Sequence, residues 1–518
     1  MEDIVVSMKN ICKVYPNGVM ANKDVNLDIR RGEIHALMGE NGAGKSTLMK
    51  MLFGLEQPTS GEIWLNGEKV VLPSPNAAIG HGIGMVHQHF MLVPSLTVAE
   101  NIVLGMVPRK SQIFVDIKKA VKITEEYSER FNLRVDPMAK VADIPVGMKQ
   151  KVEILKALVR GAKILILDEP TAVLTKQETT ELFKELLALK KHGYTLIFIS
   201  HKLQEIMEIT DRLTILRGGR SMGVYNTCDV SPAEISRLMV GRDVLLNVTK
   251  TKAQPQKVVL QVRDLNYVNE WGKRMLDNIS FSVRQGEILG IAGVEGNGQK
   301  ELVDMLFGLN RPDSGTITVN GEKIIGMNQR KLRDRHISLV PEDRMLYGIA
   351  AEANIVSNTL SDRLHNKKYN AGPLFKMRAL QEETDELIKE YRVLCKNREQ
   401  NVGMLSGGNI QKVVVAREFS NSPQLIIADQ PTRGIDVGAT EFIRQKLVEL
   451  ARSGVAVLLV SADLNEVMEL SDSLIVMYGG HITGYFKDSR ELDDEKIGKY
   501  MLGLAQQSAE EITGVCYE

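Results

Sequence analysis

The fold of this chain is decided by Ile34-His35-Ala36-Leu37-Met38, followed directly by Gly39-Glu40-Asn41-Gly42-Ala43-Gly44-Lys45-Ser46-Thr47. The first five residues read as a buried strand, and the residues after Lys45 have a helical pattern. The glycine-rich stretch between them fits G-x-x-x-x-G-K-[ST], in which backbone N–H groups turn toward phosphate oxygens and the lysine adds positive charge. We therefore predict a phosphate-binding loop between a strand and a helix, with Ser46 as a Mg²⁺ ligand.

The chain repeats this region about 250 residues later. Asp277 to Ile288 matches Asp24 to Ile34, and Phe307-Gly308-Leu309 matches Phe53-Gly54-Leu55 at an offset of 254 residues. A period of this length is too long for a solenoid and fits two tandem domains. In both copies apolar β-branched runs alternate with helical patterns, which predicts an α/β fold with parallel sheets. We expect domains at 1–246 and 258–503, a linker at 247–257 and a solvated tail at 504–518.

The composition excludes several classes of protein. The 518 residues include 65 Lys and Arg against 65 Asp and Glu, so no net charge favours nucleic acid or an anionic membrane surface as partner. The four cysteines lie far apart and match neither a disulfide framework nor a zinc or iron–sulfur site. We expect a reducing compartment, no signal peptide and no membrane-spanning segment.

Two acidic residues follow another apolar run, in Leu165-Ile166-Leu167-Asp168-Glu169-Pro170. Unpaired buried carboxylates are costly, whereas a metal ion and a water molecule would explain both. Asp168 would then hold Mg²⁺, and Glu169 would polarise the attacking water. The alternative is an acid that caps the next helix. His201 follows a further apolar strand, where a lone histidine is most often only a strand-end residue.

Taken together, the phosphate loop, Gln88, Asp168-Glu169 and Ser200-His201 resemble the nucleotide-binding domain of ATP-binding cassette (ABC) transporters. The signature loop of that family stands in the second half as Leu405-Ser406-Gly407-Gly408-Asn409-Ile410-Gln411. The resemblance covers nearly the whole chain. It implies that each half has a mostly parallel sheet core, an antiparallel β subdomain and a helical signature subdomain.

The resemblance also implies the cofactors and the residues that bind them. ATP and Mg²⁺ would bind at the loop Gly39 to Thr47. Tyr15 would stack on adenine, and Gln88 would link Mg²⁺ to a transmembrane partner. His201 would contact the γ-phosphate, and would act in catalysis together with Glu169 and Gln88.

The two halves depart from the family pattern at complementary places. In the second half the residues of the hydrolytic site are replaced: Lys45 by Gln299, Ser46 by Lys300, Gln88 by Glu342, Glu169 by Gln430, and His201 by Ala462. In the first half the signature loop carries Pro145 where the second has Ser406, and the separate D-loop carries Thr175 where the second has Asp436. Lys300 could be read as a slipped phosphate-loop lysine, but the spacing Gly293 to Gly298 puts Gln299 at that position.

In the family, each nucleotide lies between the phosphate loop of one domain and the signature loop of the other. By that rule every intact element falls in one composite site, in which the first-half residues meet Ser406, Gly407, Gly408 and Asp436. The replaced residues all fall in the other composite site. We therefore expect one hydrolytic site per chain, and one site that is structural or binds nucleotide without turnover.

Two cassettes on one chain resemble the energising subunit of prokaryotic importers of simple sugars and nucleosides. That resemblance implies two transmembrane permease subunits, an extracytoplasmic substrate-binding lipoprotein and a peripheral place at the cytoplasmic face of the membrane. The segments Gly84–Val93, Val152–Leu158, Gly293–Gln299 and Asp429–Gly434 look closer to the nucleoside branch, linked to basic membrane proteins, than to the sugar branch. A soluble twin-cassette ATPase acting on ribosomes or DNA is a remote alternative, as is a regulatory protein that binds nucleotide without hydrolysis.

Overall fold

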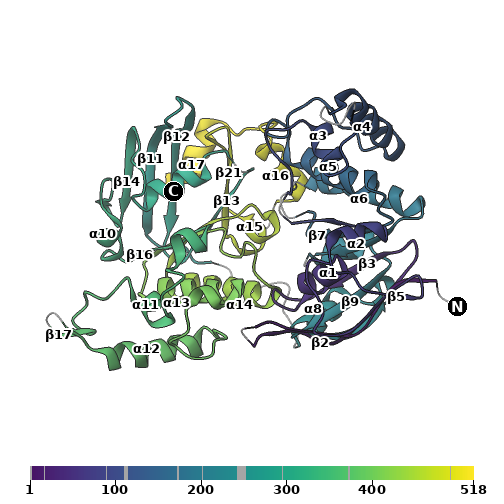
Figure 1. Cartoon of the computed structure of the whole chain (residues 1–518). Coiled ribbons are helices and arrows are strands. Elements are labelled where there is room, and N and C mark those ends of the chain that lie inside the picture. The colour runs from purple at the N-terminus through teal and green to yellow at the C-terminus, as the bar shows by residue number, and fades with distance from the viewer. Residues whose placement is uncertain are drawn as a thin grey trace. The chain divides into compact units, whose positions relative to one another are not determined.

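The computed structural model describes residues 3–16, 18–88, 90–109, 115–171, 174, 176–200, 202–241, 253–294, 296–371, 374–489 and 492–517. The chain divides into two compact units, Met1–Val244 and Leu245–Glu518, whose elements are labelled in Figure 1. Of the expected linker at 247–257, residues 247–252 lie outside the described part.

Unit 1 is built from ten strands and eight α-helices within its described residues. The strands are β1 (Ile4–Val14), β2 (Met20–Arg30), β3 (Ile34–Met38), β4 (Ser60–Leu65), β5 (Glu68–Val70), β6 (Ile83–Val86), β7 (Ile164–Asp168), β8 (Thr195–Ile199), β9 (Arg212–Arg217) and β10 (Arg220–Asn226). The helices are α1 (Lys45–Leu52), α2 (Pro75–Gly80), α3 (Val98–Val103), α4 (Ile117–Phe131), α5 (Val146–Val159), α6 (Lys176–Lys191), α7 (Leu203–Ile209) and α8 (Pro232–Val240).

The central sheet of unit 1 has the order β10-β9-β3-β8-β7-β6, and all its pairs are parallel except β10 with β9. Strands β3, β7 and β8 are buried along their whole length, as expected for a parallel sheet covered on both faces. A second, antiparallel sheet has the order β2-β1-β4-β5. Since β3 and β7 both point their carboxyl ends to one edge, the loops after them converge there.

Unit 2 repeats this plan. Its strands are β11 (Val258–Val268), β12 (Arg274–Arg284), β13 (Ile288–Ala292), β14 (Ser314–Val319), β15 (Glu322–Lys323), β16 (Ile337–Val340), β17 (Asn370–Ala371), β18 (Leu374–Phe375), β19 (Leu425–Asp429), β20 (Ala456–Val460), β21 (Ser473–Tyr478) and β22 (His481–Phe486). Its helices are α9 (Gln299–Leu306), α10 (Gln329–Arg333), α11 (Ile355–Leu360), α12 (Met377–Glu390), α13 (Gly407–Ser420), α14 (Val437–Arg452), α15 (Leu464–Leu470), α16 (Asp494–Met501) and α17 (Ala509–Tyr517).

The sheets of unit 2 have the orders β16-β19-β20-β13-β21-β22 and β12-β11-β14-β15. Figure 1 shows β11, β12 and β14 side by side, as this order requires. A π-helical turn, Arg344–Gly348, and the short hairpin of β17 and β18 precede the helices of the signature region. The predicted parallel core, antiparallel sheet and helical region are therefore present in both units.

The expected tail at 504–518 contains a helix. Helix α17 packs beside β12 and β22, and Ile512 lies against the hydrophobic core of unit 2. Gln507 holds the segment before α17 against β22, because its backbone N–H donates to Thr483 O and its side chain accepts from Tyr485 N. The sequence alone does not predict helix α17, because the surface that this helix covers is assembled from distant strands.

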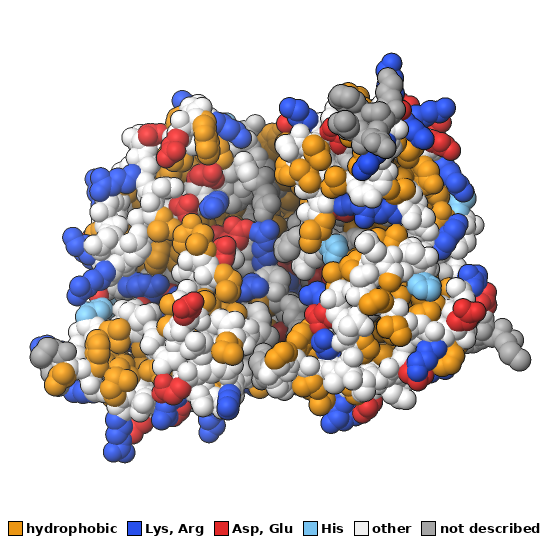
Figure 2. Space-filling model, viewed as in Figure 1, with side chains coloured by type: hydrophobic (Ala, Val, Ile, Leu, Met, Phe, Trp, Pro, Cys, Tyr) orange, Lys and Arg blue, Asp and Glu red, His pale blue; other side chains and the backbone are white. Residues whose placement is uncertain are grey.

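The surface agrees with the absence of net charge. Figure 2 shows basic and acidic side chains interspersed over the face in view. Within the described ranges, no helix has both the length and the apolar character needed to cross a membrane.

Candidate functional site

The phosphate loop of unit 1 connects β3 to α1, as predicted. Gly44 caps α1 in the left-handed conformation, with φ of 95°. A Cβ atom on Gly44 would come within 2.4 Å of Ala21 O, and one on Gly39 within 2.3 Å of Leu216 O. Both positions therefore require glycine, because the loop lies directly against neighbouring backbone. Glu40, Asn41, Gly42 and Ala43 complete the loop between them.

Lys45 is the first residue of α1 and is only 6% exposed. Its Nζ donates hydrogen bonds to Gly39 O at 2.7 Å and to Glu40 O at 3.0 Å. The ammonium is thus held over the loop by two backbone carbonyls, where it would meet the charge of bound phosphates.

Asp168 ends β7 and is 8% exposed. Burial, and next the negative charge of Glu169, raise the pKa of the Asp168 carboxyl above its ordinary value, while Lys45 and a hydrogen bond from Ser46 oppose this rise. A buried acid beside a hydroxyl fits a Mg²⁺ site that is completed by phosphate and water oxygens. No group of three or more His, Cys, Asp or Glu side chains in the described ranges could hold a metal by itself.

Glu169 and Gln88 lie together at the same edge of the sheet. Gln88 Nε2 donates to Glu169 Oε2 at 2.9 Å, and the backbone N–H of Glu169 donates to Ile199 O at 3.0 Å. Glu169 has φ of 47°, an unusual conformation for a residue with a side chain. Such backbone strain persists where the surroundings enforce it, often at functional sites.

Tyr15 lies near the end of the loop. Its hydroxyl donates to Glu56 Oε1 at 2.9 Å and lies 3.4 Å from Thr47 Oγ1. The polar end of the ring is therefore fixed to the protein, and its place beside Thr47 is compatible with the predicted contact with adenine.

Two predicted residues, His201 and Thr175, lie outside the described residues. The neighbours of His201 are described: Ser200 Oγ and Thr171 Oγ1 both donate to Glu205 Oε2, at 3.0 and 2.7 Å. The end of β8 is thereby joined to the segment that follows Asp168 and Glu169.

The second phosphate loop confirms the predicted alignment of Gln299 with Lys45. Gln299 Nε2 donates to Val294 O at 3.2 Å, and this carbonyl is the counterpart of Glu40 O. The described residues of this loop therefore keep this contact without the lysine charge.

The residues around that loop are more acidic than in unit 1. Glu342 forms an ion pair with Arg433, and Gln430 Oε1 accepts from Ala462 N at 3.1 Å. Burial, followed by the charges of Glu342 and Asp304, raises the pKa of Asp429 to about 7. Asp304 stands where unit 1 has Lys50, a charge reversal that the comparison of the two halves could have found.

The intact signature loop belongs to unit 2. Ser406 precedes α13 with φ of −67° and ψ of 156°, and its Oγ accepts from Asn409 Nδ2 at 2.8 Å. Asp436 caps α14 through Ala439 N at 2.7 Å. A Cβ atom on Gly408 would lie 2.2 Å from Asp436 Oδ2. Ser406, Gly407, Gly408 and Asp436 thus form one local cluster.

Sequence reasoning missed Arg344 in this cluster. Its guanidinium donates to Arg433 O at 2.7 Å and to Gly434 O at 3.2 Å, and it lies close to Gly407. No motif marks this arginine, because its partners are backbone carbonyls far along the chain.

In unit 1 the signature position is occupied by Pro145. It has φ of −59° and ψ of 159°, nearly the same backbone as Ser406, so proline fits without strain. The substitution removes a hydroxyl and leaves the helix start intact.

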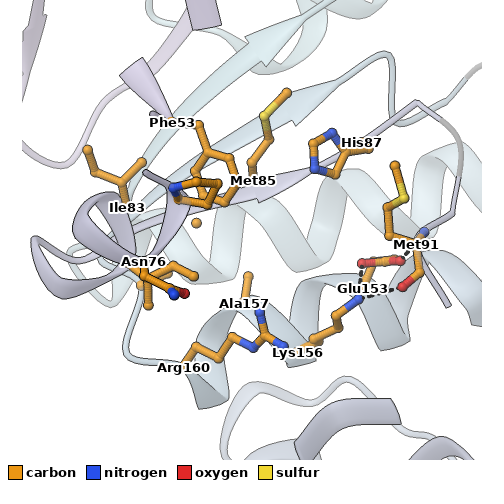
Figure 3. A pocket seen from close by; sticks show the side chains of 14 residues that line it. Phe53, Asn76, Ile83, Met85, His87, Met91, Glu153, Lys156, Ala157 and Arg160 are labelled. Carbon is orange, nitrogen blue, oxygen red and sulfur yellow. Dashed lines mark hydrogen bonds and ion pairs between the residues drawn. The ribbon is translucent and has the colours of Figure 1, made fainter. Parts of the chain in front are cut away.

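Unit 1 also has a groove of about 210 Å³ beside the segment that follows Gln88. Its walls come from α2, β6 and α5, with Phe53, Ile83 and Met85 on one side and Lys156 and Arg160 on the other (Figure 3). Glu153 accepts from Met91 N at 2.6 Å, and Lys156 donates to Met91 O at 2.7 Å. The segment 90–94 is thus anchored to α5 at Met91.

The corresponding part of unit 2 carries large charged side chains. Arg333 and Glu418, aligned with Ile79 and Ala157, form two hydrogen bonds of 2.8 and 2.9 Å, and Arg417 adds one of 2.8 Å. Arg333 also lies over Phe307, the counterpart of Phe53, at 5.5 Å from the ring centroid. The two units therefore differ here in shape as well as in charge.

Comparison with known proteins supplies the family. The model of the ABC transporter family matches residues 22–172 and 276–433. The guanosine import ATP-binding protein NupO of Bacillus subtilis is 46% identical over 99% of this chain and 100% of its own. The nucleoside import ATP-binding protein NupA of Lactococcus lactis is 42% identical, over 97% of this chain and 98% of its own. The glucose import ATP-binding protein TsgD13 of Haloferax volcanii is 41% identical, over 97% and 96%.

These findings confirm the resemblance, the α/β fold with tandem nucleotide-binding domains and the ATPase activity predicted from the sequence. The family model matches each half once, and the relatives extend over nearly the entire chain. This chain belongs to the ABC transporter family, as an ATP-hydrolysing member with two nucleotide-binding domains.

Proposed function

We propose that this chain energises the import of nucleosides through separate transmembrane permease subunits, with one hydrolytic site per chain. The observation that carries the single site is the way the residues sort between units. Lys45, Asp168 and Glu169 lie at one sheet edge of unit 1, whereas the signature serine and the Asp436 cap lie in unit 2. The hydrolytic site would form when these two sets enclose one ATP.

In that site Glu169 acts as general base toward water, and Gln88 holds its carboxylate in place. Lys45 and the loop N–H groups neutralise and orient the phosphates. Ser46 and Asp168, with Gln88 nearby, would hold Mg²⁺, which would offset the negative charge of the phosphates. His201, Ser406 and the glycines after it would contact the γ-phosphate, and closure and reopening around ATP would drive the permeases.

The choice of nucleosides rests on the relatives and on the loop sequences. NupO and NupA carry nucleoside names and match at 46% and 42% identity, while TsgD13 carries a sugar name and matches at 41%. A simple sugar of the ribose or galactose type is the second candidate, because the sequence identity to TsgD13 is only slightly lower than the identity to NupO and NupA.

Uptake of labelled guanosine, adenosine, ribose and galactose, in cells with and without the chain, tests this choice. Loss of nucleoside uptake alone supports the proposal. Loss of sugar uptake alone moves the chain to the sugar branch, and no loss of either contradicts both.

The partners follow from the importer role. We propose two permease subunits, an extracytoplasmic lipoprotein that delivers the substrate, and a peripheral location at the cytoplasmic face of the membrane. The groove of unit 1, with apolar walls and a basic rim of Lys156 and Arg160, would receive a permease loop that carries an apolar side chain and an acid. The charged counterpart in unit 2, with Arg333 and Glu418, would present a different docking surface.

A further inference from the structure

The described residues of the second phosphate loop, which exclude position 295, keep the turn into the helix that unit 1 has at Gly44. Gly298 caps α9 with φ of 102° and ψ of −3°, and Gly44 caps α1 with φ of 95° and ψ of 6°. Both helices then begin at the next residue, Gln299 or Lys45. Because loop N–H groups and the start of the helix supply much of the attraction for phosphate, this cradle alone can hold a nucleotide tail.

The positive charge of this loop has moved by one residue. Gln299 occupies the place of Lys45, bonded to the equivalent carbonyl, and is neutral. Lys300 stands where unit 1 has Ser46, the residue suited to Mg²⁺. The cation of the second loop therefore lies at the metal-ligand position.

The other side chains do not fit a metal ion either. Mg²⁺ takes oxygen ligands and is repelled by a nearby ammonium group. Glu342, at the position of Gln88, already forms an ion pair with Arg433. A divalent cation here would have to displace Lys300 and compete with Arg433.

Lys300 is available to a ligand. Its side chain is exposed, and within the described part of the chain it makes no hydrogen bond and no ion pair. Its charge nevertheless acts on the carboxyls of the site: burial raises the pKa of Asp304 and of Asp429, and Lys300 opposes both rises. Lys300 thus lies near these two carboxyls, at the position that Ser46 holds in unit 1.

We propose that the second phosphate loop binds a nucleoside triphosphate without a divalent metal, and that Lys300 Nζ supplies the cation that Mg²⁺ supplies in unit 1. The inference deepens the proposed function, on which it rests, by assigning a ligand state to the site without turnover.

The test is equilibrium dialysis of the full chain with labelled ATP, in magnesium and in excess EDTA. We expect two nucleotides per chain in magnesium and one in EDTA. Lys300→Ser should weaken the EDTA-resistant binding about tenfold or more, as expected for loss of a charged hydrogen bond. Lys300→Arg, which keeps the charge, should retain it. Absence of bound ATP in EDTA, or unchanged binding in Lys300→Ser, would overturn the proposal.

A matched variant separates the two loops. Lys45→Ala should remove the magnesium-dependent nucleotide and leave the EDTA-resistant one, and loss of the EDTA-resistant nucleotide in this variant would assign it to unit 1 and overturn the inference. Failure of the proposed hydrolytic site would instead show as magnesium-dependent ATPase activity that survives Glu169→Gln. The two failures are therefore distinguishable.

Discussion

Gln88 Nε2 donates a 2.9 Å hydrogen bond to Glu169 Oε2, across 81 residues of sequence. The bond joins the segment that leads to the groove with the acid expected to activate water. A displacement of the segment after Gln88 would thus change the position of the Glu169 carboxylate. In unit 2 the same positions hold Glu342 and Gln430, and these bind Arg433 and Ala462 instead.

Glu169 and its aligned residue, Gln430, should contribute unequally to turnover. We expect Glu169→Gln to lower steady-state ATPase activity about 100-fold or more, because a general base is lost. Gln430→Glu should change the rate little, since the rest of that site is replaced. Phosphate release by the purified chain measures both, and substantial turnover in Glu169→Gln would end the single-site interpretation.

The loop glycines should differ in their tolerance of a methyl group. Gly44→Ala combines φ of 95° with a contact of 2.4 Å to Ala21 O, whereas a Cβ atom on Gly42, with φ of 84°, meets nothing within 4 Å. Gly42→Ala should therefore lower the free energy of unfolding by about 1–2 kcal/mol, the cost of the left-handed conformation. Gly44→Ala should cost clearly more. Equal losses in denaturant titrations would contradict the close approach.

The signature position should separate folding from catalysis. Pro145 and Ser406 share one backbone conformation, so Ser406→Pro should leave the thermal unfolding midpoint nearly unchanged. It should lower ATPase activity at least tenfold, because a hydroxyl expected at the γ-phosphate is lost. Pro145→Ser is the matched control and should not raise the activity. A Ser406→Pro chain with normal turnover would argue against the proposed composite site.

Asp429 should make unit 2 less stable at high pH. Its pKa rises on folding from an ordinary value near 4 to about 7, so between these values the folded state holds a proton that the unfolded state has released. Stability therefore falls as the pH rises through this range. Asp429→Asn should stabilise the chain by roughly 3 kcal/mol more at pH 8 than at pH 5. Denaturation at the two pH values measures this, and equal gains would refute it.

A bulky side chain in the groove of unit 1 should weaken the binding of the chain to its permease subunits. Ala157 lines the groove, and Ala157→Phe should reduce permease-dependent sedimentation with membranes while ATP binding persists. Val224→Phe, on β10 at the opposite sheet edge from β6, is the matched control. Arg160→Ala gives a second variant that does not overpack the core. Normal sedimentation of both groove variants would exclude this docking site.

Much of the fold and of the unit 1 site could be predicted because the decisive signals are local. The strand Ile34–Met38, the loop after it and the acids that end β7 are contiguous patterns with a direct physical meaning. That Gln88 and Glu169 share one site was implied only by the family resemblance, and the hydrogen bond between them was not predicted. Their roles stay predictions.

What sequence reasoning missed depends on packing between distant segments. Arg333 meets Glu418 across 85 residues, and Arg344 meets carbonyls about 90 residues away. Neither contact follows from a sequence motif, because the packing of the sheet, and not the local chain, brings the partners together. Helix α17 was missed for the same reason, since the strands that it covers lie far from it in sequence.

The buried pair of Arg333 and Glu418 makes the two halves impossible to exchange for one another. Glu418 is fully buried, and its loss would remove the carboxylate partner of Arg417 and one of the two carboxylates that pair with Arg333, at a cost of about 3–5 kcal/mol. Single substitutions therefore cannot readily convert unit 2 into a copy of unit 1. Since both are translated as one polypeptide, every molecule contains one of each, and no imbalance in gene expression can produce an assembly with two units of the same kind.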